Sequence, residues 1–509
     1  MKLLFDNPEL IRNARIQLRP GRMIAAAVIC AVVSITVWIS IVRTGSEIVI
    51  DGMTQAGAVF ALILTLQIAI LLIAGGIFCL QSVHREKEMN TFDYQRVTRL
   101  TSLELAIGKL FGAPILAYVL VLCLMPVALT GAVVAKLAAQ DVIMAYVLVL
   151  LGCVAFHALM LLVSVLLGRS GIAVSMLLFL MLVAASSTDF AELQSPWAIH
   201  RLNPFYVLDL FSHHLFVWGP QASISFQDSF WGVSVPHTAV LVVLYATFTA
   251  WFLAAVARNM KRDPSAYEIL PAPGMFLFVM YVNFLMLSFL SWKTAPEGEE
   301  TVPALLVLSL WSLWLLAFVL LRNRGKVRGR SRKLLGQAAS WWAALWPAPY
   351  LALGAAIVGG TTVVLTAYHR EPGSYWSWHM AAYYVAFLIV WLSRDALYLQ
   401  WMALRRAKHP LGSAVVYLAI FYVCTSVVFV AFDIYENARG AAFTAAFIPS
   451  AFFVLNDRLW GPAMRVWMMP LFLQAAAAFA FAWLHKQRLA EFITEPEGRV
   501  SSADIAQSA

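Results

Sequence analysis

Two adjoining stretches of the sequence decide the fold. Residues 58–80 read AVFALILTLQIAILLIAGGIFCL, and residues 85–109 read REKEMNTFDYQRVTRLTSLELAIGK. The first stretch has no charged side chain and is long enough to cross the hydrocarbon core of a bilayer, which takes roughly 20 apolar residues in an α-helix. The second stretch is dense in charge, so the chain leaves the membrane there.

The composition of the whole chain favours a membrane protein. Of its 509 residues, 61% are hydrophobic and 12% are charged, about half the charged share of a soluble domain. This excludes a soluble protein, and the net charge of +9 is better explained by membrane topology than by nucleic acid. Neither zinc nor disulfide spacing is present among the cysteines, which all lie in apolar runs: Cys30, Cys79, Cys123, Cys153 and Cys424.

Apolar stretches of membrane-spanning length recur along the chain. They predict an all-α polytopic membrane protein with twelve transmembrane helices, near 23–42, 58–80, 110–134, 142–167, 171–187, 237–257, 273–292, 303–321, 346–367, 380–397, 411–431 and 465–484. An even number of crossings puts both termini on one side. The segments assigned to that side hold 28 of the 36 Lys and Arg residues, which predicts cytoplasmic N- and C-termini. The membrane in which we expect the chain is the bacterial inner membrane.

The two sets of six helices suggest an internal duplication. Corresponding helices begin about 250 residues apart, and Gly171-Ile-Ala-Val-Ser-Met-Leu is similar to Gly412-Ser-Ala-Val-Val-Tyr-Leu. Evenly spaced loops in any twelve-helix chain are the alternative explanation. A duplication predicts two parallel six-helix halves, residues 1–262 and 263–490, followed by a disordered cytoplasmic tail over 491–509.

Two amphipathic stretches flank the first spans. Asn7 caps and Pro8 begins an expected N-terminal helix, the elbow, which ends at Pro20-Gly21. After the second span, Val97, Leu100 and Leu103 lie three residues apart and predict a short interfacial helix. Ser102 is the expected cap of the next helix, with Glu104 in its first turn.

The segment 85–109 resembles the permease signature of the second exporter class of ABC transporters. The similar features are a Glu-Lys-Glu cluster, a threonine, and the run Thr-Arg-Leu-Thr-Ser-Leu-Glu-Leu that closes on Gly-Lys. The resemblance covers about residues 1–260. It fades in the second half, where no acidic residue occurs from Arg322 to Trp346.

This resemblance implies six helices per half and a coupling helix that docks on a separate ATPase subunit, which acts as a dimer. It implies a connecting element at Arg85, Glu86, Glu88 and Thr91, a coupling helix from Val97 to Glu104 that includes Leu100, Thr101 and Leu103, and re-entry into the bilayer at Gly108 and Lys109. The substrate class that suits an apolar helix interface is an amphiphile.

The chain has no recognisable catalytic motif of its own. No Gly-x-x-x-x-Gly-Lys-Ser/Thr loop occurs, so we expect a transport subunit rather than an enzyme, with no cofactor in this chain and with ATP and Mg²⁺ on the partner. The pair His213-His214 is interpreted as exposed polar residues, and His157 as a neutral imidazole bonded to a neighbouring helix. Arg394 and Asp395, at the end of the tenth expected helix, either pair locally or snorkel to the interface.

Two other classes of function stay open on the sequence alone. An ion-coupled secondary transporter with parallel repeats needs a titratable group near the bilayer midplane. A membrane enzyme acting on lipid-linked substrates needs clustered external carboxylates, and Asp189, Glu192, Asp209 and Asp228 are available without a recognised spacing.

Overall fold

The structure is a computed structural model of the full chain. It describes the following residues, with gaps between them, and the statements below concern these residues: 6–44, 49–50, 53–167, 203–207, 227–230, 233–263, 267–288, 312–314, 316–317, 319–320, 348–368, 378–405, 413–421, 424 and 464–494. Two compact units make up the chain, Met1–Pro271 and Ala272–Ala509. The six-helix halves expected over 1–262 and 263–490 stay predictions.

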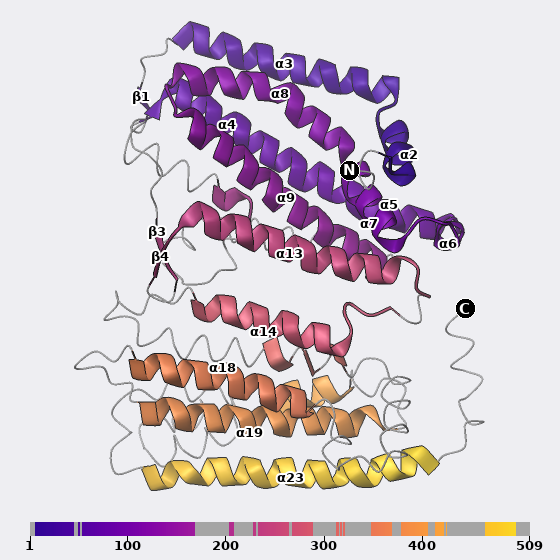
Figure 1. Cartoon of the computed structure of the whole chain (residues 1–509), viewed down its shortest axis with the longest axis vertical. Coiled ribbons are helices and arrows are strands. Elements are labelled where there is room, and N and C mark those ends of the chain that lie inside the picture. The colour runs from indigo at the N-terminus through magenta and orange to yellow at the C-terminus, as the bar shows by residue number, and fades with distance from the viewer. Residues whose placement is uncertain are drawn as a thin grey trace. The chain divides into compact units, whose positions relative to one another are not determined.

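The described part of the first unit is almost entirely helical (Figure 1). Its helices are α2 (Pro8–Gln17), α3 (Pro20–Thr44), α4 (Gln55–Ile70), the π-helical turn η1 (Leu71–Gly75), α5 (Gly76–Glu88), α6 (Phe92–Arg96), α7 (Ser102–Gly112), α8 (Ile115–Val134), α9 (Ala139–Leu167) and α13 (His237–Met260). Two short antiparallel hairpins accompany them, β1 (Val49–Ile50) with β2 (Met53–Thr54) and β3 (Gln227–Phe230) with β4 (Val233–Pro236).

Five helices of the described residues are long and apolar enough to cross a membrane. They cover Pro20–Val37, Ala56–Glu88, Ile115–Val134, Ala139–Leu166 and His237–Met260, and each coincides with an expected span. The fifth expected span, 171–187, lies outside the described residues. Twelve crossings and the side on which the termini lie stay predictions.

Large apolar side chains face outward along these helices. On α3, Ile24, Val28, Ile29 and Val32 are each more than half exposed. A surface of this kind is unfavourable in water and is satisfied by lipid tails. The fold therefore defines a helical membrane protein, as its composition predicts.

The helix observed at the second expected span is longer than the apolar run 58–80, and it contains the π-helical turn η1. Helix continues from Gln55 to Glu88, so the charged residues 85–88 form its last turn rather than a loop after it. At the π-turn, His157 Nε2 lies 2.8 Å from the Leu71 carbonyl oxygen, and its Nδ1 lies 2.9 Å from the Tyr118 hydroxyl. The expectation that His157 bonds to neighbouring helices is confirmed. Gly75 makes room, since a Cβ there would lie 2.3 Å from Nε2.

Two apolar clusters form the core of the first unit. The larger one joins α4, α8, α9 and α13 through residues such as Phe60, Leu64, Leu148 and Tyr245. The smaller one lies at the end where α5, α6 and α7 meet, and it includes Val83, Phe92, Leu105 and Leu161. This second cluster supports the charged segment that the sequence singles out.

The second unit is described in part. Its helices are α14 (Ala272–Ser288), α18 (Ala348–Tyr368), α19 (Trp378–Ala403) and α23 (Met464–Thr494). Gly359 of α18 packs on Val385 of α19 so closely that a Cβ would lie 2.2 Å from its Cγ1. On α19, Arg394 Nε donates to Asp395 at 2.8 Å, which confirms the expected local pair, and Arg394 also donates to Gln474 of α23 at 2.7 Å.

Several expectations fall on residues outside the described ones. These are the span at 171–187, most of 303–321, the basic run 322–333, the segment up to Trp346, and the pair His213-His214. Helix α23 continues to Thr494, into the first residues of the expected disordered tail, and the rest of that tail is also outside.

Candidate functional site

A sharp turn follows the second membrane helix. Asn90 has a left-handed backbone with φ of 55°, the Asn90 amide donates to the Lys87 carbonyl at 3.1 Å, and the Thr91 amide donates to the Glu86 carbonyl at 2.8 Å. This pair of bonds is a Schellman C-cap, in which asparagine tolerates the left-handed position. The turn ends α5 and directs the chain into α6.

Helix α6 lies within the charged segment 85–109 and has one buried face and one exposed face. Phe92 and Gln95 are buried on its inner face, whereas Tyr94 is 74% exposed and Val97, directly after it, is 82% exposed. Asp93 is exposed as well, and it accepts from Arg96 at 2.8 Å. We call residues 89–101 the α6 segment. Figure 1 shows α6 at the same end of the first unit as α2 and α7.

The position expected for the interfacial helix is wrong. Residues 97–101 are not helical, and the helical turn lies earlier, at Phe92–Arg96. The physical reason is that Phe92 and Gln95, three residues apart, anchor α6 inward, while a cap at Thr101 starts the next helix. Val97, Leu100 and Leu103 therefore share no helical face.

The expected cap of α7 also shifts by one residue. Thr101, and not Ser102, is the N-cap: its hydroxyl accepts from the Glu104 amide at 3.2 Å, and Glu104 Oε2 accepts from the Thr101 amide at 2.7 Å. This is a capping box, whose spacing of three residues fits Thr101 with Glu104. These hydrogen bonds to Thr101, with the Lys261 ammonium as a smaller contribution, hold the pKa of Glu104 below its usual value.

Next to the α6 segment lie four charged side chains, Glu9, Arg12, Glu86 and Lys109, which we call the buried charge cluster; Glu9, Glu86 and Lys109 are buried, and the Arg12 side chain is 43% exposed. Lys109 is 0% exposed, and its Nζ lies 2.6 Å from Glu86 Oε2 and 2.9 Å from Glu9 Oε1. Arg12 bridges Glu9, at 2.9 Å, and Glu86. The cluster joins α2, α5 and α7 with two positive and two negative charges.

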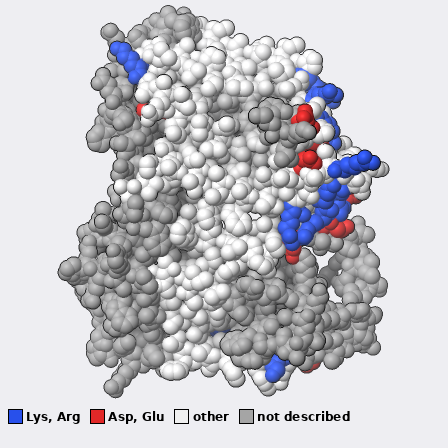
Figure 2. All heavy atoms as spheres, in the orientation of Figure 1, with Lys and Arg blue, Asp and Glu red and all other residues white. Residues whose placement is uncertain are grey.

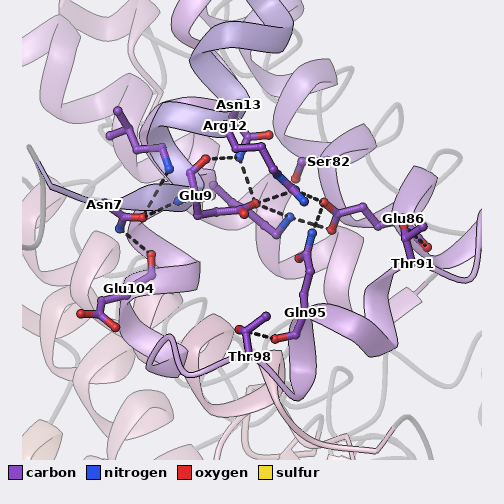
Figure 3. Close-up of polar contacts among 12 residues, drawn as sticks. Asn7, Glu9, Arg12, Asn13, Ser82, Glu86, Thr91, Gln95, Thr98 and Glu104 are labelled. Carbon is purple, nitrogen blue, oxygen red and sulfur yellow. Dashed lines mark hydrogen bonds and ion pairs between the residues drawn. The ribbon is translucent and has the colours of Figure 1, made fainter.

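Neutral polar groups complete the cluster. Gln95 Nε2 donates to Glu86 Oε1 at 2.6 Å, which attaches α6 to the cluster, and Asn13 Nδ2 donates to Glu9 Oε1 at 3.0 Å. Figure 3 shows the side chains of Arg12 and Gln95 both reaching the Glu86 carboxylate. Burial of charge is costly unless it is paired and hydrogen-bonded, and here every charged member has such a partner.

The elbow helix is placed by its cap and by glycines of α7. Asn7 caps α2 as the sequence predicts, accepting from the Glu9 and Leu10 amides, and its Nδ2 donates to the Glu104 carbonyl at 2.7 Å. A Cβ at Gly108 would lie 2.8 Å from Asn7 Oδ1, and one at Gly112 would lie 2.9 Å from the Asn13 Cβ. Glycine at both positions thus lets α2 rest directly on α7.

The structure brings together only some of the site residues expected from the sequence. Glu86, Gly108 and Lys109 are buried at the cluster, and Thr91 donates from its hydroxyl to the Glu86 carbonyl at 3.2 Å. Exposed members are Arg85, Glu88, Val97, Thr101 and Leu103, with Leu100 and Glu104 partly exposed. Glu88 lies 3.2 Å from His84.

Sequence reasoning missed three members of the site, Glu9, Arg12 and Gln95. The signal that pointed to Glu9 was its place in the first turn of a capped helix, but nothing local shows that the helix turns it inward. Lysine at position 109, at the start of a long apolar run, was the clue that a carboxylate must lie nearby, because buried lysine needs a partner.

Charge at this end of the first unit is visible from outside. Figure 2 shows most of the charged side chains of the described first unit gathered at the end where α2 and α6 lie. Among the described residues, no group of three or more His, Cys, Asp or Glu side chains is placed to hold a metal ion.

Fold and site together define the class, a multi-span helical membrane protein with a cluster of charged side chains at one end of its first unit. Comparison with protein-family models, with curated proteins and with solved structures found no match to the chain. Function is therefore inferred from the geometry of this charged element and from the sequence signature that it carries.

Proposed function

We propose that the chain is the permease subunit of an ATP-driven ABC transporter of the second exporter class, located in the bacterial inner membrane. It exports or extrudes an amphiphilic substrate, and a separate ATPase subunit, acting as a dimer, binds and hydrolyses ATP. The single observation that carries the proposal is the α6 segment, an exposed element fixed to three membrane-connected helices by the buried charge cluster.

The surface of the α6 segment fits a protein partner. Met89, Tyr94 and Val97 are 64%, 74% and 82% exposed, and Asp93 and Arg99 lie among them. Exposed aromatic and apolar side chains with charged neighbours are typical of residues that become buried in protein interfaces. The ATPase subunit is the partner that the signature implies, and we propose α6 as the element that docks on it.

Force on α6 has a short path into the membrane. Gln95 of α6 is hydrogen-bonded to Glu86, and Glu86 forms ion pairs with Arg12 of α2 and Lys109 of α7. Separating Lys109 from Glu86 and Glu9 leaves two buried carboxylates with only the partly exposed Arg12 as a cation, at a cost of about 3 kcal/mol. Under load, α2, α5, α6 and α7 therefore move together, and the spans that continue from α5 and α7 tilt with them.

The test is site-specific photo-crosslinking in cells. A photoreactive amino acid replaces Tyr94, and a matched position, Gln140, carries it in the control; Gln140 is also exposed but lies in the first turn of α9. We expect Tyr94 to yield one adduct whose second protein contains a phosphate-loop ATPase motif, and Gln140 to yield none.

Two outcomes would contradict the proposal. An adduct of Tyr94 with lipid alone would place α6 in the membrane, and transport that continues without ATP but stops with an ionophore would indicate the ion-coupled alternative. Copurification of the wild-type complex in mild detergent gives an independent check, since an ATPase subunit should accompany the chain.

A further inference from the structure

The segment that joins the two units folds back onto the site. Asn259 and Glu268 exchange two hydrogen bonds, from Asn259 Nδ2 to the Glu268 carbonyl at 2.5 Å and from the Glu268 amide to Asn259 Oδ1 at 3.0 Å. The Glu268 carboxylate also accepts from Arg258 at 3.0 Å and from Arg262 at 3.3 Å. We call residues 258–263 and 267–271 the strap.

The strap contacts the α6 segment through both polar and aromatic groups. Lys261 Nζ donates to the Thr98 carbonyl at 2.8 Å, and Asp263 lies 3.8 Å from Arg96. A further contact is made by Lys87 of α5, whose ammonium lies near the Phe92 ring of the α6 segment and the Tyr267 ring of the strap.

Lys87 Nζ lies 5.7 Å from the centre of the Phe92 ring on α6 and 5.0 Å from the centre of the Tyr267 ring on the strap, and it donates to the Val165 carbonyl at 2.6 Å. Cation–π contacts are strongest where the ammonium is shielded from water. One ammonium thus joins α5, α6, α9 and the strap.

Apolar packing follows the same pattern. Tyr267, Ile269 and Leu270 pack against the smaller core cluster, which also holds Phe92 of α6 and Val83 of α5. A connection between two units needs only polar, solvated residues to span the gap. This one instead buries apolar side chains beside α6, and it leads within one residue of Leu270 to Pro271 and then to α14.

We propose that the strap is a transmission element: it fixes the α6 segment to the end of α13 and carries displacement of α6 along the chain into the first turn of α14. Its functional consequence rests on the proposed function, since α6 is displaced by the ATPase subunit. The strap would also explain a difference between the two halves of the sequence. The second unit has no acidic residue from Arg322 to Trp346, where a second coupling helix is expected. In the proposal, the second unit is displaced through the strap and not through a coupling helix of its own.

Hydrogen–deuterium exchange of the full chain in lipid nanodiscs tests the strap without an ATPase. We expect Tyr267→Ala to speed amide exchange in residues 92–98 about tenfold, and Phe92→Ala to speed it in residues 267–271 about equally, since coupling is reciprocal. Tyr267→Phe is the matched control. It keeps the ring and removes only a hydroxyl that is buried without a hydrogen-bond partner, so exchange in α6 should stay within about twofold of the wild type.

Unchanged exchange in residues 92–98 of Tyr267→Ala, with α9 still protected, would overturn the strap. Should that variant fail to fold, Glu268→Gln weakens the bonds to Arg258 and Arg262 and keeps the aromatic contact, and we expect a smaller rise in the same peptides. A rise confined to residues 258–271 would equally contradict the proposal.

A second arm adds the ATPase subunit with a non-hydrolysable ATP analogue. We expect exchange in the first turn of α14 to change on nucleotide addition in the wild type and in Tyr267→Phe, but not in Tyr267→Ala, although all three bind the ATPase. Equal changes in all three would overturn transmission through the strap. Failure of the wild type to bind the ATPase would contradict the proposed function, and the first arm would still decide the strap.

Discussion

Lys109 and Glu86 form an ion pair of 2.6 Å that has almost no contact with solvent. The two residues belong to α7 and α5, on either side of the α6 segment, so the pair closes the base of the loop that α6 forms. Glu9 reaches the same ammonium from α2 at 2.9 Å. One lysine therefore fixes the relative positions of three helices, and the first prediction removes it.

Replacing Lys109 with Met should destabilise the protein by about 3 kcal/mol, because the buried carboxylates of Glu9 and Glu86 then keep only the partly exposed Arg12 as a cation. Unfolding in detergent with increasing denaturant measures the difference. Lys136→Met, at an exposed lysine after α8, is the matched control and should change stability by less than about 0.5 kcal/mol. Equal changes in the free energy of unfolding for the two substitutions would show that the ion pair of Lys109 does not stabilise the protein.

Gly108→Ala should separate α2 from α7. The added methyl group would lie 2.8 Å from both Asn7 Oδ1 and Glu9 Cβ, and overpacking of this kind costs about 1–3 kcal/mol. Gly21→Ala is the control, since nothing lies within 4 Å of its Cβ position, and it should be neutral or slightly stabilising in a helix. Thermal unfolding compares them, and an equal melting temperature for the two variants would contradict the close contact.

Asn90→Val should destabilise the turn after α5, whereas Asn90→Gly should leave it unchanged. Asn90 has φ of 55°, which glycine adopts freely and a β-branched residue adopts only at a cost of about 1–2 kcal/mol. We expect Asn90→Gly to keep wild-type stability and Tyr94 crosslinking, and Asn90→Val to lower both. Wild-type behaviour of Asn90→Val would mean that the turn is not needed to present α6.

Local chemistry explains which features of the sequence could be predicted. The cap at Asn7 and the start of α2 at Pro8 depend on residues within one turn, and both agree with the structure. For α7, the side chains of both Thr101 and Ser102 could cap the helix. A capping box needs a Glu or Gln three residues after the cap. Glu104 is three residues after Thr101, so Thr101 is the cap.

Tertiary contacts explain what sequence reasoning missed. The spacing of Val97, Leu100 and Leu103 is helical, but α6 forms earlier because Phe92 reaches the core and Gln95 reaches Glu86. Nothing near position 9 or position 109 shows that these residues meet, since 100 residues of chain separate them. A buried lysine signals that a partner exists, but only the fold shows which carboxylates it is.

Glu104 gives the candidate site a defined pH dependence. Its hydrogen bonds to Thr101 lower its pKa in the folded protein, so the carboxylate stabilises the fold fully at pH values above its unfolded pKa, about 4.3. The contribution is lost as the pH falls through the lower, folded pKa. The stability difference between wild type and Glu104→Gln should therefore be constant near neutral pH and should shrink in acid below about pH 4.3. Thr101→Ser, which keeps the hydroxyl, should follow the wild-type curve, whereas a difference that grows on acidification would contradict the capping box as the cause of the lowered pKa.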